Sequence, residues 1–264
     1  MTDQEVLDFC KKGFLILEGV IPDSTNRWVS EEMDLRSSDK MEWLARDERY
    51  INEVLLHPEV AGVARSLLGE NFQMPDWIAN HRLVGPVPAK SWHMDAGSDF
   101  ERKCNILQVF HIPQENTMEM GPTFVVPGSH LVPIPREELD HYGGLAGQVA
   151  TAAPAGSVFF TAYSIWHRQS NKVDSSTRNL LKWDYWRTTP PKRDWLFDPD
   201  FDFIGAEYDY TNDYFDGPAR KWQSVLRVAE MFYWICGKSD EFHHFGGSGW
   251  PFSVSDPAIK GDKG

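Results

Sequence analysis

The sequence predicts a mainly β protein with flanking helices, built around a double-stranded β-helix (jelly roll, cupin-like) core. Between residues 72 and 187, short segments rich in Val, Ile, Phe, Trp and Thr alternate with Gly, Pro and Asn. This alternation is typical of an antiparallel β-sandwich or barrel and not of β-α-β repeats. A jelly roll accommodates so many short strands best.

The composition predicts a chain that buries a substantial core. Hydrophobic residues make up 41% and aromatic residues 13% of the 264 residues, which argues against extensive disorder. No linker is long enough to divide the chain, so we expect a single domain over residues 1–264. Within it, residues 1–70 hold N-terminal helices and a first strand, residues 72–187 the jelly-roll core, and residues 190–264 an aromatic flap, a helix and a tail.

The formal net charge of -13 argues against a nucleic acid or an anionic membrane as partner, because both need a basic surface. We therefore expect a small-molecule substrate. The three cysteines show no paired spacing, which favours reduced thiols over a disulfide framework. The N-terminus has no secretory signal, and apolar runs fall short of the ~20 residues that span a bilayer. A cytoplasmic location is expected.

The N-terminal elements follow from caps and apolar spacing. Thr2 and Glu5 have the spacing of a capping box, which predicts a helix that ends at Gly13. The apolar residues 14–17 then predict a buried strand, closed by Pro22.

Two further helices are expected before the β region. The polar residues 23–46 are predicted to be helical, and Pro58 begins a clear helix that ends at Gly69. The predicted strands of the core are residues 77–84, 105–112, 123–126, 157–166 and 179–186.

After Pro191 the chain becomes aromatic and acidic. We interpret this segment as an irregular flap packed on the barrel; a lid over the barrel mouth is the alternative. Residues 219–236 carry a strong apolar face and predict a final helix.

The segment Trp92-His93-Met94-Asp95 holds the first candidate for chemistry. On an extended segment, side chains alternate with period two, so His93 and Asp95 point to the same side. An imidazole and a carboxylate presented together are two ligands for a metal. Two His and one carboxylate on one face of Fe(II) leave open positions for substrate and O2. A solvated loop before a strand is the alternative.

Two later residues complete the pattern. His167 follows the apolar residues 158–162 and is the candidate third ligand; a structural histidine bonded to a loop is the alternative. Arg178 opens the apolar strand 179–186, where an unpaired buried charge is expensive. It pairs either with a protein carboxylate or with a bound carboxylate, which Arg grips in bidentate fashion.

In these residues the sequence resembles the phytanoyl-CoA dioxygenase family of Fe(II)- and 2-oxoglutarate-dependent oxygenases. The resemblance rests on Trp92-His93-Met94-Asp95, on the Gly…Pro-Gly-Ser-His turn of residues 121–130, and on His167 followed by Arg178. It covers roughly residues 4–187 and leaves the C-terminal third without a counterpart.

The resemblance implies iron at one end of a jelly roll, with His93, Asp95 and His167 as its ligands. Arg178 would hold the distal carboxylate of 2-oxoglutarate, whose decarboxylation with O2 gives succinate and CO2. Most such enzymes hydroxylate a C–H bond, here of a small organic metabolite. Related halogenases lack the carboxylate ligand, so Asp95 favours hydroxylation or another oxidation.

Several other residues are weaker candidates. Thr123, Asn80 and Gln108 are possible contacts to 2-oxoglutarate, with plain polar residues of a sheet as the alternative. His111 and His130 are alternative metal ligands, although the tight turn around His130 favours a hydrogen-bonding role. Lys90 lies either on the surface or at the mouth of the site beside an anionic substrate.

Two rival functions fit the same residues. A zinc hydrolase would use the His93, Asp95 and His167 site without needing Arg178. A non-catalytic jelly-roll module would keep the metal for structure or for ligand sensing. The fold alone does not decide among these functions, because jelly rolls host many unrelated functions.

Overall fold

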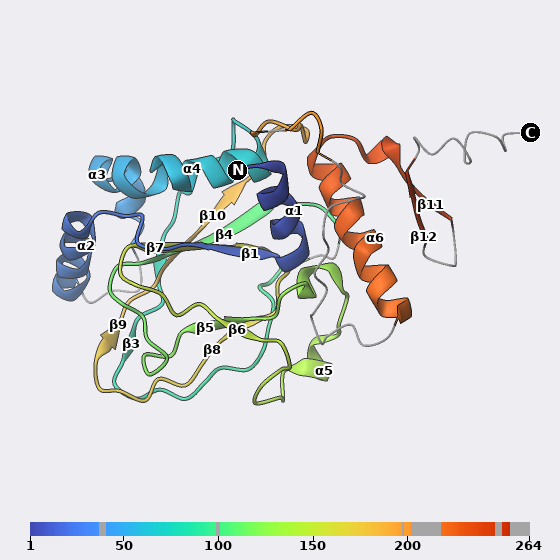
Figure 1. Ribbon diagram of the computed structural model, residues 1–264. Helices are drawn as coiled ribbons and strands as arrows, with labels where there is room; N and C mark the ends of the chain where they lie inside the picture. Colours follow the sequence, from blue (N-terminus) through green and yellow to red (C-terminus); the bar gives the residue numbers. More distant parts are fainter. Residues whose placement is uncertain (37–40, 99–100, 197, 202–217, 246–249, 254–264) are drawn as a thin grey trace, which may run out of the picture.

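Two antiparallel sheets lie one above the other in the computed structural model, which describes residues 1–36, 41–98, 101–196, 198–201, 218–245 and 250–253 (Figure 1). The larger sheet has five strands in the order β1 (Phe14–Leu17), β7 (Ser157–Ala162), β4 (Ile106–Ile112), β10 (Leu181–Trp186) and β2 (Ala79–Asn80). The smaller sheet has three strands in the order β6 (Val149–Ala150), β5 (Thr123–Val125) and β8 (His167–Gln169). Strands β3 (Leu83–Val84) and β9 (Thr177–Arg178) form a separate pair. The expected mainly β fold with a jelly-roll core is confirmed.

The strands of the larger sheet are buried on both faces. Most residues that face the helices are apolar and join the main core, and they include Leu107, Val109, Phe160, Trp183 and Tyr185. The alternate residues face the space between the sheets, and the polar ones among them include Gln108, Thr161, Lys182 and Asp184. The barrel interior is therefore polar at the level of these four residues.

Helices cover the outer face of the larger sheet. Helix α4 (Pro58–Leu68) packs on β4 and β10, with Pro58 in the first turn as the sequence predicts. Helix α2 (Asp23–Arg36) stands at one end of this layer, and α3 (Glu48–Tyr50) joins it to α4 through short 3-10 and π turns at Leu44–Arg46 and Ile51–Leu55 (Figure 1). The main hydrophobic core lies between this layer and the sheet.

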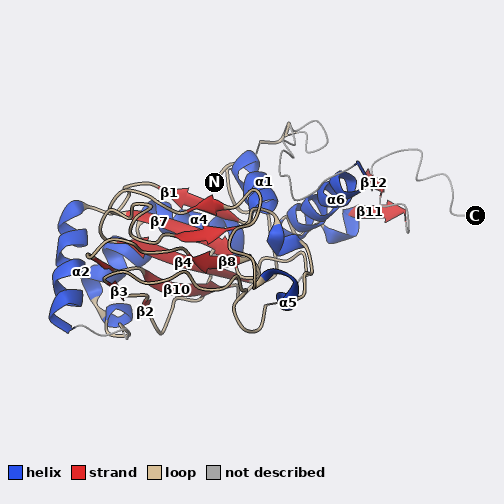
Figure 2. Cartoon of the chain, turned by 90° about the horizontal axis from the view of Figure 1, so that it is seen from below, coloured by secondary structure: helices blue, strands red, loops and turns tan. Residues whose placement is uncertain are grey.

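Helix α1 (Asp3–Lys12) has the predicted capping box and ends at Gly13, which adopts a left-handed conformation. It contacts the long helix α6 (Pro218–Ile235), which lies beyond the end of the sheets (Figure 2). The remaining elements are the 3-10 turns Ser129–Leu131 and Ser239–Glu241, helix α5 (Arg136–Leu139), and the hairpin of β11 (Phe242–Phe245) and β12 (Trp250–Ser253). No helix in the described part of the chain is long and apolar enough to span a membrane.

The expected helix over residues 23–46 is shorter in the structure. Helix α2 spans Asp23–Arg36, and the next described residues, 41–43, lie outside any helix. The predicted aromatic flap falls mainly on residues 202–217, which lie outside the described residues.

Two strands expected from the sequence are divided, because the chain crosses from one sheet to another within them. Residues 77–84 form β2, which pairs with β10, and then β3, which pairs with β9. Residues 157–166 form β7 only as far as Ala162, after which a tight turn leads into the smaller sheet.

These crossings move two site residues from where the sequence places them. His167 begins β8 of the smaller sheet instead of following one long strand of the larger sheet. Arg178 ends β9, and the apolar strand that follows begins only at Leu181. Both residues therefore lie where the chain passes between sheets.

Two glycine substitutions test the packing of the first helix. A Cβ on Gly13 would lie 2.3 Å from Nδ1 of His130, and the residue has a φ of +73°. We expect Gly13→Ala to lower the free energy of unfolding by about 2–3 kcal/mol, from left-handed backbone strain and displacement of the imidazole. Chemical denaturation measures this.

Gly62→Ala is the matched control, because Gly62 lies within α4 and a Cβ there meets nothing within 4 Å. It is expected to raise stability by up to about 1 kcal/mol through helix propensity. Equal effects of the two substitutions would contradict this account of the α1 terminus.

Candidate metal centre

His93 and His167 are brought together by their own backbones. The N–H of His93 donates to the carbonyl of His167 at 3.0 Å, and the N–H of His167 donates to the carbonyl of His93 at 2.9 Å. Residues paired in this way across an antiparallel bridge present their side chains to the same face. The two imidazole centroids lie 4.4 Å apart as a result.

Both imidazoles are oriented by a carbonyl two residues earlier. Nδ1 of His93 lies 2.9 Å from the oxygen of Ser91, and Nδ1 of His167 lies 3.0 Å from that of Ile165. Because a carbonyl only accepts hydrogen bonds, each Nδ1 carries the proton and each Nε2 offers a lone pair. Burial, and then the neighbouring His93, lowers the pKa of His167 to about 4, so this ring is neutral at physiological pH.

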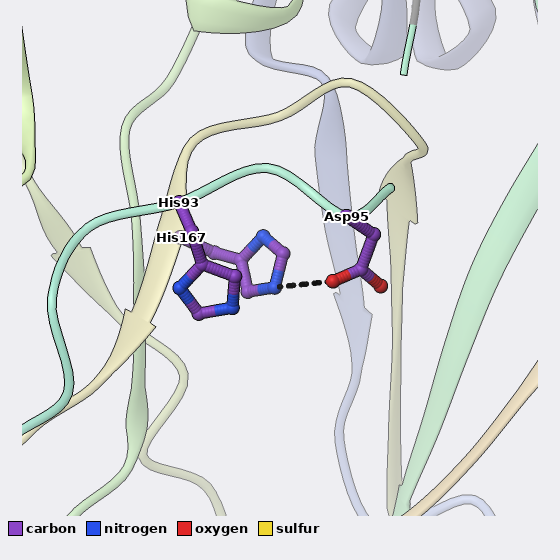
Figure 3. Close-up of side chains that lie close together, drawn as sticks. All are labelled: His93, Asp95 and His167. Carbon is purple, nitrogen blue, oxygen red and sulfur yellow. Dashed lines mark ion pairs between the residues drawn. The ribbon is translucent and has the colours of Figure 1, made fainter. Parts of the chain in front are cut away.

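Asp95 completes the group. Its Oδ1 lies 3.7 Å from Nε2 of His167, and Figure 3 shows the carboxylate turned toward that ring. Burial alone would raise the pKa of Asp95, but Lys182 and His167 outweigh this effect and lower it, so the carboxyl is ionised. One donor atom from each of His93, Asp95 and His167 lies within 4.8 Å of the other two.

This donor set fits a divalent metal. Two neutral imidazoles and one carboxylate on one face are the ligand set of non-haem Fe(II) enzymes, and they also suit zinc. It is the one cluster of three or more His, Cys, Asp or Glu residues in the described chain with such geometry.

A cavity of about 280 Å³ opens beside the three ligands and extends to Arg178. Arg178 is 2% exposed. Its Nη1 donates to the carbonyl of Gly121 at 2.6 Å and its Nη2 to the carbonyl of His81 at 3.1 Å, while its buried Nε has no hydrogen-bond partner. Burial lowers the pKa of Arg178 to about 10, which leaves the guanidinium charged.

Among the described residues, no carboxylate lies within 4.0 Å of the Arg178 guanidinium in an ion pair. Of the two sequence interpretations, pairing with a protein carboxylate thus has no support in the described structure. The arrangement is suited to an anion that enters the cavity.

The other predicted cosubstrate contacts differ in their placement. Thr123 and Asn80 line the cavity, and Asn80 also donates to Asn179 and accepts from the N–H of Leu180. The amide of Gln108 donates to Asp95 and accepts from Thr161, so Gln108 reaches the site through Asp95.

Lys90, which the sequence leaves open between surface and mouth, lines the cavity and is exposed. The cavity also holds His81, whose pKa is lowered to about 3 by loss of solvent and then by Lys182, Arg178 and Lys90. Desolvation is the largest cause of this lowering, and the three cations add to it, so positive side chains gather around the cavity in a chain of net charge -13.

The two alternative histidines have structural partners. His111 faces the helices, with its ring nitrogens 3.3 Å from the hydroxyl of Tyr50 and 2.9 Å from Oδ1 of Asn26. Nε2 of His130 lies 3.1 Å from the carbonyl oxygen of Cys10, and this hydrogen bond links the Pro-Gly-Ser-His turn to α1.

Sequence reasoning missed Lys182 and Asp184, which are 7% and 5% exposed and point into the barrel. Lys182 forms an ion pair with Asp95. Asp184 has a buried Oδ1 without a hydrogen-bond partner. The sequence feature that could have identified them is the alternation Leu181-Lys182-Trp183-Asp184-Tyr185. The same alternation is typical of a strand with one solvent-exposed face, so it does not indicate burial of the polar residues.

The family model for phytanoyl-CoA dioxygenase (PhyH) matches residues 9–178, which is more than half of the chain. No curated protein sequence gives a significant match.

Similar solved structures share the fold. The α-ketoglutarate-dependent epimerase SnoN of nogalamycin biosynthesis is 16% identical with a TM-score of 0.57, over 71% of this chain and 84% of that chain. HygX from Streptomyces hygroscopicus, with nickel and 2-oxoglutarate bound, is 15% identical with a TM-score of 0.59, over 71% and 87%. EctD from S. alaskensis, with bound Fe, is 17% identical with a TM-score of 0.59, over 74% and 79%.

Asp184 gives a prediction about pH. Burial raises its pKa to about 6, opposed by Lys182 and reinforced by Asp95. Because the folded form holds this proton more tightly than the unfolded form, stability falls as the pH rises from about 4 to about 6 and stays lower above that range. Asp184→Asn should therefore raise the free energy of unfolding at pH 7.5, by at most about 2–3 kcal/mol, and change it little at pH 4.

Denaturant titrations at both pH values measure this effect. Asp76→Asn makes the same charge change at an exposed site and should stay within about 0.5 kcal/mol of wild type. A destabilised Asp184→Asn protein at pH 7.5 would count against the assigned burial effect.

Proposed function

The chain belongs to the phytanoyl-CoA dioxygenase family, and we propose that it is an Fe(II)- and 2-oxoglutarate-dependent oxygenase that hydroxylates a C–H bond of a small organic metabolite. In this reaction the substrate, O2 and 2-oxoglutarate give the alcohol, succinate and CO2. One oxygen atom enters the product and the other enters succinate. The observation that carries the proposal is a buried arginine that has no carboxylate partner among the described residues, in the same cavity as a two-histidine, one-carboxylate cluster.

His93, Asp95 and His167 would hold the iron, whose role when bound is to activate O2 together with the cosubstrate. Two neutral imidazoles and one carboxylate leave the Fe(II) site with a net charge of +1. Such a site would favour a dianion, and a metal held by three protein atoms would keep open positions for a chelating cosubstrate and for O2.

Arg178 would bind the distal carboxylate of 2-oxoglutarate. Its position is fixed by two backbone carbonyls, and its charge lacks a protein counter-ion in the described structure, so the cosubstrate supplies the missing anion. We also propose Thr123 and Asn80 as contacts from the cavity wall, and Gln108 as a residue that acts on the site through Asp95.

Hydroxylation is the finer part of this proposal. The carboxylate of Asp95 takes the ligand position that chloride needs in the related halogenases, which disfavours halogenation. Similar structures include an epimerase and a carbocyclase as well, and the ligand set of His93, Asp95 and His167 is the basis for proposing hydroxylation for this chain.

We further propose that the chain works as one cytoplasmic domain. The pairing of β1 with β7 supports a single domain, because it joins the N-terminal segment to the core. Three free, buried cysteines suit a reducing compartment.

An anaerobic titration tests the cosubstrate site. Addition of Fe(II) and then 2-oxoglutarate to the metal-free protein should produce the visible charge-transfer band of the chelate. Arg178→Ala should weaken 2-oxoglutarate binding by about 10–100-fold, because it removes charge-assisted hydrogen bonds worth about 1.5–3 kcal/mol.

Arg65→Ala is the control, because Arg65 forms an exposed ion pair with Asp194 and should leave the band unchanged. No band in a folded wild-type protein would exclude the proposal. Catalytic activity of the Arg178→Ala protein in the absence of 2-oxoglutarate would favour a zinc hydrolase instead.

A further inference from the structure

Two side chains converge on a single oxygen of Asp95. The ammonium of Lys182, from β10, and the amide of Gln108, from β4, both donate to Oδ2. Gln108 is itself held by the hydroxyl of Thr161, from β7, at 3.2 Å. Three adjacent strands of the larger sheet thus fix one oxygen of a carboxylate that comes from a loop outside the sheet.

The other oxygen of Asp95 faces the ligands. Oδ1 is the atom 3.7 Å from Nε2 of His167, on the side of the cluster where a metal would lie. The two oxygens therefore have separate environments, one turned to protein donors and one turned to the metal position.

Lys182 is confined to this place. Its side chain is 9% exposed, and its Nζ lies 5.7 Å from the centroid of the Phe110 ring, on which a cation is favoured. Moving the ammonium away from Asp95 would break the ion pair that Lys182 makes in the described structure, which is costly for a buried charge.

We infer that Lys182 is a positioning residue that serves as the internal counter-ion of the metal-free site and, with Gln108, keeps Oδ2 of Asp95 away from the metal. The inference rests on the metal site of the proposed function. Asp95 then binds the metal through Oδ1 alone. Single-oxygen binding leaves three positions of an octahedral ion open, whereas binding through both oxygens would leave two, too few for a chelating cosubstrate and O2 together.

This role gives Lys182 opposite effects on two quantities. In the metal-free protein, it stabilises the fold by neutralising a partly buried carboxylate. When a divalent metal binds nearby, the same ammonium repels it and keeps part of the carboxylate charge engaged. Lys182 thus lowers the affinity for the metal. In return it raises the stability of the metal-free protein and keeps one coordination position of the metal open. A residue that merely packs would not separate the two quantities.

Titration with Co(II) alone, followed through its visible absorption, tests the inference. Lys182→Met should bind Co(II) at least about 10-fold more tightly than wild type, since even a small part of the repulsion exceeds the equivalent 1.4 kcal/mol. Its melting temperature without metal should be lower by several degrees. Lys182→Arg, which keeps the charge, should bind Co(II) with an affinity near that of wild type.

Lys172→Met is the matched control. The ammonium of Lys172 is also buried and also paired with an aspartate, Asp174, but it touches none of the three ligands. This variant should lose stability and keep the wild-type affinity for Co(II). A gain of affinity in both variants would point to general loosening and would overturn the inference.

The outcomes separate the two proposals. If the wild-type protein does not bind Co(II), the proposed function itself is contradicted. A wild-type protein that binds Co(II), together with a Lys182→Met protein of equal or weaker affinity, overturns the role of Lys182 and leaves the oxygenase proposal intact. If Lys182→Met is unfolded without metal, Co(II) should refold it by replacing the lost counter-ion, and failure to refold also overturns the inference.

Discussion

The backbone bridge between His93 and His167 is the constraint on which the rest of the site depends. It is an isolated pair of hydrogen bonds outside any long strand, so something else must hold the two segments together. The preceding residues do this, because Trp92 and Trp166 are fully buried in one cluster with Val126. The N–H of Trp166 also donates to the hydroxyl of Ser129, from the Pro-Gly-Ser-His turn. Tryptophan packing therefore orients both imidazoles before any metal arrives.

Around this bridge, the barrel gathers positive charge within an acidic protein. Arg178, Lys90 and Lys182 all lie in or beside the cavity, and Asp95 is the one carboxylate that lines it among the described residues. The net charge of -13 argues against extended polyanions as partners but says nothing about a cavity of this size. A negative net charge is thus combined with a cavity lined or flanked by three cationic side chains.

The sequence predicted the site better than it predicted the strands. His93 and Asp95 follow from period-two alternation, and His167 and Arg178 from their order along the chain and the family resemblance. The predicted strand ends were wrong where the chain crosses from one sheet to another. An apolar segment has a similar composition before and after such a crossing, so the sequence does not mark the position of the crossing. Lys182 was missed because its partner Asp95 is 87 residues away, and no local pattern reports such a pairing.

The interior carries charges that a purely structural jelly roll would avoid. Arg178 has an unsatisfied Nε, Asp184 an unsatisfied Oδ1, and Lys182 is buried with a single aspartate as its ion-pair partner. Taking each of these groups out of water opposes folding, and replacing a whole buried pair such as Lys182 with Asp95 by apolar residues would avoid that cost, whereas replacing Lys182 alone would leave Asp95 without its counter-ion. Their presence is explained if anion and metal binding relieve part of the cost, because ligand affinity then includes the release of strain already present in the folded protein.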